Sequence, residues 1–379
     1  MRSARNWGNS RQAGALIALC TAFGLVACEG EKKSPTTSEG DSGISDKPAI
    51  DPSIAKAMAA ASARRGSGPA ANNQGGPPSG GVFEPGAADK EMPRGTAPRI
   101  TLGSEGTEPR VLLGAMQPKP GFKRNMTLQL LMRAGRQGMP PLDFAFTLQA
   151  QKPKAAAPAG AEGAAPAPAN AAPEGVAVSA TVQSVRVAPS QAMGIPKEVE
   201  QQLGALKGSK VDFTVQSNGA GDGFRYTLSK TADPGLENAM RSFAEALTTV
   251  TLPYPDKPVG KDAFWMATSR ESAIGVEVVA YRMVKVEAVE GDKVKLSINT
   301  KRYAVDKTFD LPELPKDTKF TLDEFQSVGE GNYEVSKDVP FPLSGELTLN
   351  LMAALIPANQ PDQRAQVESR TRAAFNLSK

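Results

Sequence analysis

Apolar and polar residues alternate along much of the chain from residue 100 onward. The alternating runs are 142–149, 176–187, 211–215, 224–228, 274–289, 294–298 and 347–351. A period of two puts the apolar side chains on one face of a strand, which is typical of half-buried antiparallel sheets. In the second run the phase slips before Val185, as at a β-bulge. The pattern predicts an α+β fold that is mainly antiparallel β.

Two segments follow a helical period instead. Residues 196–206 carry Val199, Leu203 and Leu206 on one face. Residues 234–247, with Asp233 as N-cap, carry a second apolar stripe. We predict two short helices that each cover one side of a sheet. The last stretch, 363–377, fits a closing strand by alternation, although its propensity also allows a helix.

Composition divides the chain into segments. Residues 1–27 have the pattern of a signal peptide, and residues 28–98, rich in Gly, Pro, Ser, Ala and charge, predict a disordered tether. Residues 99–379 form the predicted exported domain. An Ala/Pro-rich stretch at 152–174 lies between two strand-like segments, so it predicts an insertion in a hairpin.

Two strand segments resemble each other. Residues 208–217 and 291–300 both place an alternating run directly after a glycine turn. A true repeat would give two similar β units side by side. If the likeness arises by chance, the domain is a single sheet, and the sequence does not decide between the two.

The end of the apolar stretch at the N-terminus is the most specific motif in the chain. Arg2, Arg5 and Arg11 precede a stretch that is too short to span a bilayer. It ends in Leu25-Val26-Ala27-Cys28, which resembles the lipobox of bacterial lipoproteins. The resemblance implies that signal peptidase II recognises residues 25–27 and cuts before Cys28, which carries acyl chains such as palmitate. It implies an exported protein anchored to the cell envelope, and Glu29 in place of an aspartate favours the outer membrane.

Charge and cysteine content narrow the function further. The formal net charge is +4, but residues 1–27 hold three arginines and no acidic residue, so a chain beginning at Cys28 carries +1. A nearly neutral chain gives no support for nucleic-acid binding. After loss of Cys20 and acylation of Cys28 no thiol remains for a disulfide or a metal site.

The chain contains no histidine. Histidine is the usual general base near neutral pH and the commonest transition-metal ligand. Its absence excludes Ser-His-Asp and Cys-His hydrolases and histidine-bound zinc or haem. It leaves carboxylate pairs, Ser-Lys dyads and oxygen-ligated calcium. We predict no cofactor and no metal, and favour a protein that is not an enzyme.

Residues 252–261, which lead to Trp265, resemble a proline-rich motif in a family of exported bacterial β-rich proteins that brings no activity with it. The resemblance implies a curved sheet or half-barrel units. Such a sheet with two helices is similar to the periplasmic lipoprotein-carrier and lipoglycan-carrier families, which bind acyl chains on an apolar face. Aromatic residues on a half-buried sheet usually belong to its core. The alternative is a ligand groove, lined by Tyr254, Phe264, Trp265 and Tyr281.

One acidic cluster offers a different chemistry. Its members are Asp306, Asp310, Glu313, Asp323 and Glu324. A pair of these carboxylates would suit glycoside hydrolysis, whereas the interspersed lysines are typical of a solvated loop. Our first hypothesis is a membrane-anchored binding module for an apolar ligand or an envelope protein. The alternatives are a carboxylate-dependent hydrolase of envelope polymer and a structural assembly subunit.

Overall fold

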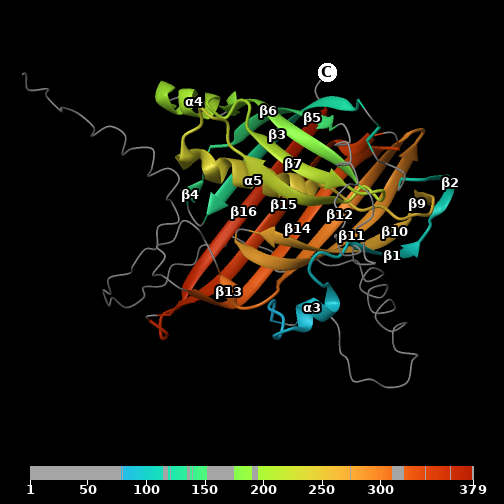
Figure 1. Ribbon diagram of the computed structural model, residues 1–379. Helices are drawn as coiled ribbons and strands as arrows, with labels where there is room; N and C mark the ends of the chain where they lie inside the picture. The colour runs from blue at the N-terminus through green and yellow to red at the C-terminus, as the bar shows by residue number, and fades with distance from the viewer. Residues whose placement is uncertain are drawn as a thin grey trace, which may run out of the picture. The chain divides into compact units, whose positions relative to one another are not determined.

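A large open antiparallel sheet dominates the chain (Figure 1). The computed structural model describes residues 78, 80–113, 118–119, 121–134, 137–138, 140–151, 175–189, 195–273, 275–309, 320–337, 339–358 and 360–377. All of them belong to one compact unit. The expected signal peptide, most of the expected tether and the 152–174 insertion lie outside these residues.

The elements follow in this order: α3 (Ala87–Glu91), β1 (Arg99–Ser104), β2 (Thr107–Val111), β3 (Lys123–Ala134), β4 (Gln137–Gly138), β5 (Leu142–Ala150), β6 (Val176–Val187), α4 (Lys197–Gly204), β7 (Lys210–Val215), β8 (Gly221–Thr227), the 3-10 turn η2 (Pro234–Leu236), α5 (Glu237–Val250), β9 (Val259–Lys261), β10 (Phe264–Ala273), β11 (Val276–Glu290), β12 (Lys293–Ala304), β13 (Thr308–Phe309), β14 (Phe320–Ser336), β15 (Val339–Pro357) and β16 (Ala365–Leu377). No described helix is long and apolar enough to cross a membrane.

The described sheet has fourteen strands in the order β1-β10-β11-β12-β14-β15-β16-β3-β5-β6-β7-β8, with β13 beside β14 and β4 beside β3. Strands β2 and β9 form a separate small pair. The C-terminal strand β16 pairs with β3, near the start of the domain. This pairing joins both segments of the suspected repeat, which fall in β7 and β12, into one continuous sheet.

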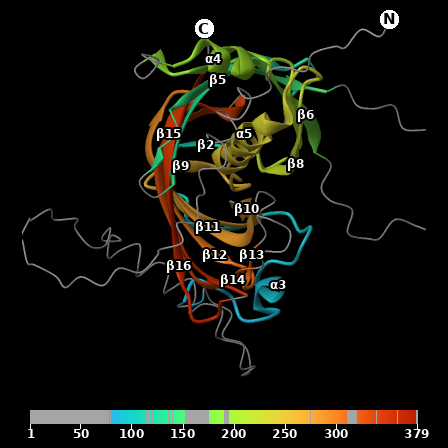
Figure 2. The same ribbon diagram turned by 90° about the vertical axis from the view of Figure 1, so that its left-hand side faces the viewer.

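The sheet curves around α5 (Figure 2). We call the face toward α5 the inner face and the opposite face the outer face. The inner face and the two predicted helices share one large apolar core, to which α4 contributes Leu203 and α5 contributes Met240 and Phe243. Phe243 stacks on Phe144 of β5 at 4.7 Å between ring centroids. The prediction of a curved, mainly antiparallel α+β fold with two short helices is confirmed.

Part of the segment expected to be a tether packs on the outer face. Phe83, Ala88 and Met92 are buried against Val279 and Tyr281 of β11. Arg270 of β10 fastens this segment, because its guanidinium pairs with Asp89 of α3 at 2.5 Å and also donates a hydrogen bond to the Met92 carbonyl. The packed chain therefore begins before residue 99.

The alternating runs become strands where the pattern predicts them. The phase slip before Val185 is a bulge in the β5–β6 pairing, and the ambiguous C-terminal stretch is strand β16. The sequence pattern did not predict β14. The acidic cluster overlaps the start of this strand, and its mixed charge is typical of a solvated loop. This strand contains Gly329 and Gly331, which are unusual in strand interiors. A Cβ at Gly329 would lie 2.8 Å from the Thr348 carbonyl oxygen and 2.4 Å from Leu349 Cδ2, so the close approach of the β15 backbone favours glycine there.

Candidate functional site

The four aromatic residues of the predicted groove lie on both faces of the sheet. Trp265 and Tyr254 belong to the inner core, where the Trp265 indole donates a hydrogen bond to the Pro253 carbonyl at 3.0 Å. Burial raises the pKa of the Tyr254 hydroxyl. Phe264 and Tyr281 share the outer parity of β10 and β11, so the structure does not bring these two together with Tyr254 and Trp265.

A buried ionic cluster occupies the inner face instead. It consists of Glu271 on β10, Arg282 on β11 and Arg302 on β12, with side chains that are 3%, 3% and 7% exposed. Arg282 Nη2 donates to Glu271 Oε2, and Arg302 Nε lies 2.7 Å from Glu271 Oε1. Each arginine also donates to a hydroxyl at 3.0 Å: Arg282 to Ser269, and Arg302 to Thr249 of α5.

Burial and ion pairing act in opposite directions on these groups. Burial alone would raise the pKa of the Glu271 carboxyl, but Arg282 and Arg302 outweigh it and hold the pKa below its ordinary value of 4.5. Burial lowers the pKa of Arg302, against the pull of Glu271 and of Glu245 on α5. Glu271 is therefore ionised at neutral pH.

Three hydroxyl groups lie close to this cluster. Thr300 is paired across the strands with Arg282, and Ser327 of β14 with Arg302. Tyr333 lies further along β14, opposite Leu296 and within the core under α5, and the charges of the ionic cluster also act on the pKa of its hydroxyl. These hydroxyls have no hydrogen-bond partner within the described protein, and the same holds for Nε of Arg282. We call this set the polar belt: Glu271, Arg282, Thr300, Arg302, Ser327 and Tyr333.

The polar belt separates two apolar clusters on the inner face. The core under α5 ends at Ala267, Val284 and Ile298 on β10, β11 and β12. Beyond the belt a second apolar cluster begins, made of Ala273, Val276, Val278, Ala304, Phe320, Leu322, Phe325, Ala353 and Leu355. It takes no residue from any described helix.

A sequence signal for the belt did exist. Along β11 the inner-face positions are all apolar except Arg282, and along β12 they are apolar until Thr300 and Arg302. A charged residue on the apolar parity of a strand is costly to bury unless it is paired. Periodicity alone does not tell which strands bring the partners.

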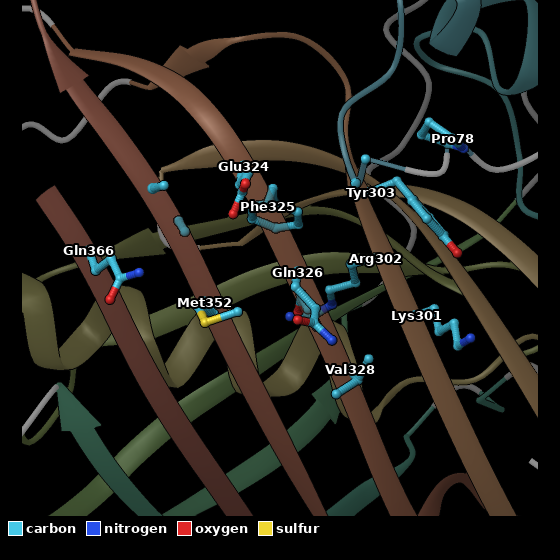
Figure 3. Close-up of a pocket in the computed structure, with 15 residues that line it drawn as sticks. Pro78, Lys301, Arg302, Tyr303, Glu324, Phe325, Gln326, Val328, Met352 and Gln366 are labelled. Atoms are coloured by element: carbon cyan, nitrogen blue, oxygen red, sulfur yellow. The ribbon is translucent and has the colours of Figure 1, made fainter. Parts of the chain in front are cut away.

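An open hollow of about 650 Å³ lies on the outer face next to the belt. Figure 3 shows Lys301, Gln326, Met352 and Gln366 on the neighbouring strands β12, β14, β15 and β16, with a helix behind the sheet. The exposed fraction of Met352 is 42%, which is unusual for so large an apolar side chain. The lining also includes belt residues Arg302 and Ser327, together with Phe325 and Ala353 from the second apolar cluster.

Strands β12 and β14 separate at this hollow. The β12–β14 pairing ends at Arg302 and Ser327, and beyond it the segment around Val82 lies beside Ala304. The Ala304 amide donates to the Gly81 carbonyl at 2.9 Å. Gly81 has a φ of +80°, and a Cβ there would lie 1.6 Å from the Phe325 carbonyl oxygen. Only glycine allows this approach, so a short strap lies between β12 and β14 where their pairing ends. We call this place the strand gap.

The carboxylates of the predicted acidic cluster are engaged elsewhere. Asp323 and Glu324 both pair with Arg364, at 2.9 and 2.7 Å. Asp306 accepts a hydrogen bond from the Thr308 amide at 2.7 Å, and Asp310 and Glu313 lie outside the described residues. In the described ranges no three acidic side chains gather closely enough to hold a metal ion.

The fold is an open, curved antiparallel sheet with an apolar inner face. No protein-family model and no curated protein matches the chain. Among solved structures the chain is similar to one described as "Lipid-protein interactions in lipovitellin", with a TM-score of 0.39 and 12% sequence identity. The match covers 69% of this chain, which spans only 26% of that one. A likeness this distant does not tell what the present chain binds.

Proposed function

We propose that this chain is a lipid-anchored envelope lipoprotein whose β domain binds an apolar or amphiphilic ligand at the strand gap. The observation that carries the proposal is the second apolar cluster. It lies beside an open hollow and shares Phe325 and Ala353 with the lining of that hollow. Apolar side chains next to an opening of this size are typical of small-molecule sites, and here the cluster is buried directly behind the hollow.

Native mass spectrometry of the full chain, extracted from envelopes in a non-ionic detergent, tests the proposal. A ligand at the strand gap would add a mass that leaves on mild activation, whereas the thioether-linked anchor would stay. A chain that carries only its covalent anchor would contradict the proposal. The hydrolase alternative predicts that Asp323→Asn and Glu324→Gln abolish an activity on envelope polymer, whereas a binding module keeps its ligand in both variants.

The hollow predicts one selective variant. Met352→Glu places a carboxylate in the hollow, between Gln326 and Glu368 on the neighbouring strands, and a half-buried charge disfavours an apolar ligand. We expect the Kd, obtained from the bound fraction in native mass spectra at several ligand concentrations, to rise about tenfold, the effect of losing about 1.4 kcal/mol of binding free energy.

Leu112→Glu is the matched control for that variant. Leu112 is 43% exposed, nearly the same as Met352 at 42%, and it does not line the hollow. We expect wild-type binding. Equal loss in both variants would mean that the charge acts through general solubility, and unchanged binding in Met352→Glu would place the ligand elsewhere.

The anchor makes a separate prediction. Cys28→Ser removes the thiol that carries the diacylglycerol in the lipoproteins whose lipobox this sequence resembles. Two or three acyl chains give durable anchoring, so their loss should move the protein from the membrane fraction to the soluble fraction. Fractionation followed by immunoblotting measures it. Cys20→Ser, in the same N-terminal segment, should leave the protein on the membrane. Retention of Cys28→Ser on the membrane would disprove the anchor.

A further inference from the structure

We propose that the polar belt is a receptor for an oxyanion, the carboxylate or phosphate group of the bound ligand. The inference rests on the proposed function, since it names the head group that accompanies the apolar part. The two arginines and the three hydroxyls of the belt would hold that group at the bottom of the strand gap.

Charge is the first argument. Two guanidinium groups, 3% and 7% exposed, share the single buried carboxylate of Glu271. Glu245 of α5 acts on Arg302 from a half-buried position, so the fully buried part of the cluster carries an excess positive charge. A buried charge that is only partly compensated is costly, and an anion placed beside it lowers that cost.

Hydrogen-bonding capacity is the second argument. A guanidinium has five N–H donors in a planar fork that suits carboxylate and phosphate oxygens. Nε of Arg282 and the hydroxyls of Thr300, Ser327 and Tyr333 have no acceptor within the described protein. Buried polar atoms are rarely left without a partner. One oxyanion accepts several of these bonds at once, because each of its oxygens carries more than one lone pair.

Access is the third argument. Arg302 and Ser327 form the last pair of the β12–β14 ladder and stand among the residues that border the hollow, while their side chains have the inner-face parity of the two strands. The belt also adjoins the second apolar cluster, since Ala304 and Phe325 lie two positions further along the same strands. A head group at the belt would therefore have an apolar surface next to it for the chain it carries.

Calorimetric titration of the full chain in a non-ionic detergent tests this inference. The probes are lauric acid, monododecyl phosphate, neutral 1-dodecanol and inorganic phosphate. We expect the two anionic amphiphiles to bind more tightly than dodecanol. Binding of inorganic phosphate with a similar affinity would assign the site to a free anion, and binding of the two amphiphiles alone would assign it to a lipid head group.

Three variants locate the site. Ser327→Ala and Tyr333→Phe each delete one hydroxyl and keep the charges, and each should weaken the anionic probes severalfold while leaving dodecanol unchanged. Arg302→Met should weaken them about tenfold or more. Arg270→Met is the control, because Arg270 is equally buried, at 7%, but lies on the outer face with Asp89 and Glu277.

The outcomes separate the two proposals. If the anionic amphiphiles and dodecanol bind equally, or if the hydroxyl variants bind the anions as wild type does, the oxyanion receptor is disproved and the belt holds water instead. The proposed function then still stands on the dodecanol binding. If no dodecyl probe binds, both proposals fail. Should Arg302→Met not fold, the two hydroxyl variants decide the question.

Discussion

Replacing Glu271 by glutamine is expected to lower the free energy of unfolding by about 3–5 kcal/mol. The side chain is 3% exposed and faces Arg282 and Arg302. Glutamine keeps the shape but removes the only fully buried negative charge among the described residues of the belt, so two buried guanidinium groups repel each other with only the half-buried Glu245 nearby to offset them. Urea unfolding of the full chain, followed by the fluorescence of the buried Trp265, measures the change.

Two controls frame this prediction. Glu346→Gln breaks a pair with Arg372 in which both side chains are about half exposed, and such surface pairs contribute about 0–1 kcal/mol. Replacing all three ionic residues of the belt with methionine should restore most of the stability, because an apolar set of similar volume has no charges to desolvate. A loss below about 1 kcal/mol in Glu271→Gln would show that water reaches the cluster.

The same carboxylate sets a dependence on pH. The folded-state pKa of Glu271 lies below its ordinary value of 4.5. A lowered folded pKa contributes stability above the unfolded pKa and loses it as the pH falls through the folded value. We expect the difference in unfolding free energy between wild type and Glu271→Gln to be constant at neutral pH and to shrink below pH 4.5.

Replacing Phe243 by alanine is expected to cost about 3–5 kcal/mol, the usual range for a fully buried phenylalanine. Phe243 is 0% exposed and joins α5 to the sheet. Its ring stacks on Phe144 at 4.7 Å and meets the edge of Phe146 at 5.1 Å. The variant leaves a cavity at the centre of the inner face and weakens the packing of α5 on the sheet.

Thermal and urea unfolding measure the effect, with Phe264→Ala as the control. Phe264 is only partly buried and lies on the outer face, so a smaller loss is expected there. Hydrogen exchange adds a local readout, since the amides of α5 should lose more protection in Phe243→Ala than those of β14. Equal protection of both elements would show that α5 is held by its flanking loops.

The strands were largely predictable because their signal is local. Alternation located β5, β6 and β7 and the bulge in β6, since a period of two reports which side chains one strand buries. Strand β14 escaped because glycines at 329 and 331 interrupt its pattern. A Cβ at either glycine would lie too close to Leu349 or to the backbone of β15. This requirement comes from a neighbouring strand and not from the local sequence.

The candidate site was less accessible to such reasoning. The predicted aromatic groove joined Tyr254 and Trp265 to Phe264 and Tyr281 by residue type, but the parity of the strands separates them onto two faces. The acidic cluster was recognisable in the sequence as a group of charges. In the structure two of its members, Asp323 and Glu324, form ion pairs with Arg364. Residue type suggested chemistry in both cases, and strand register decided whether the side chains meet.

By itself the sequence determined the fold class, the two helices and the lack of histidine chemistry, because each depends on residues close together in the chain or on composition. The lipobox resemblance is equally local and stays a prediction. Only the tertiary structure decided the strand order, the strand gap and the polar belt. Glu271, Arg282 and Arg302 stand on three different strands, and Ser327 on a fourth. Their meeting depends on pairings between distant segments, which hydrogen-bond register fixes and local periodicity does not encode.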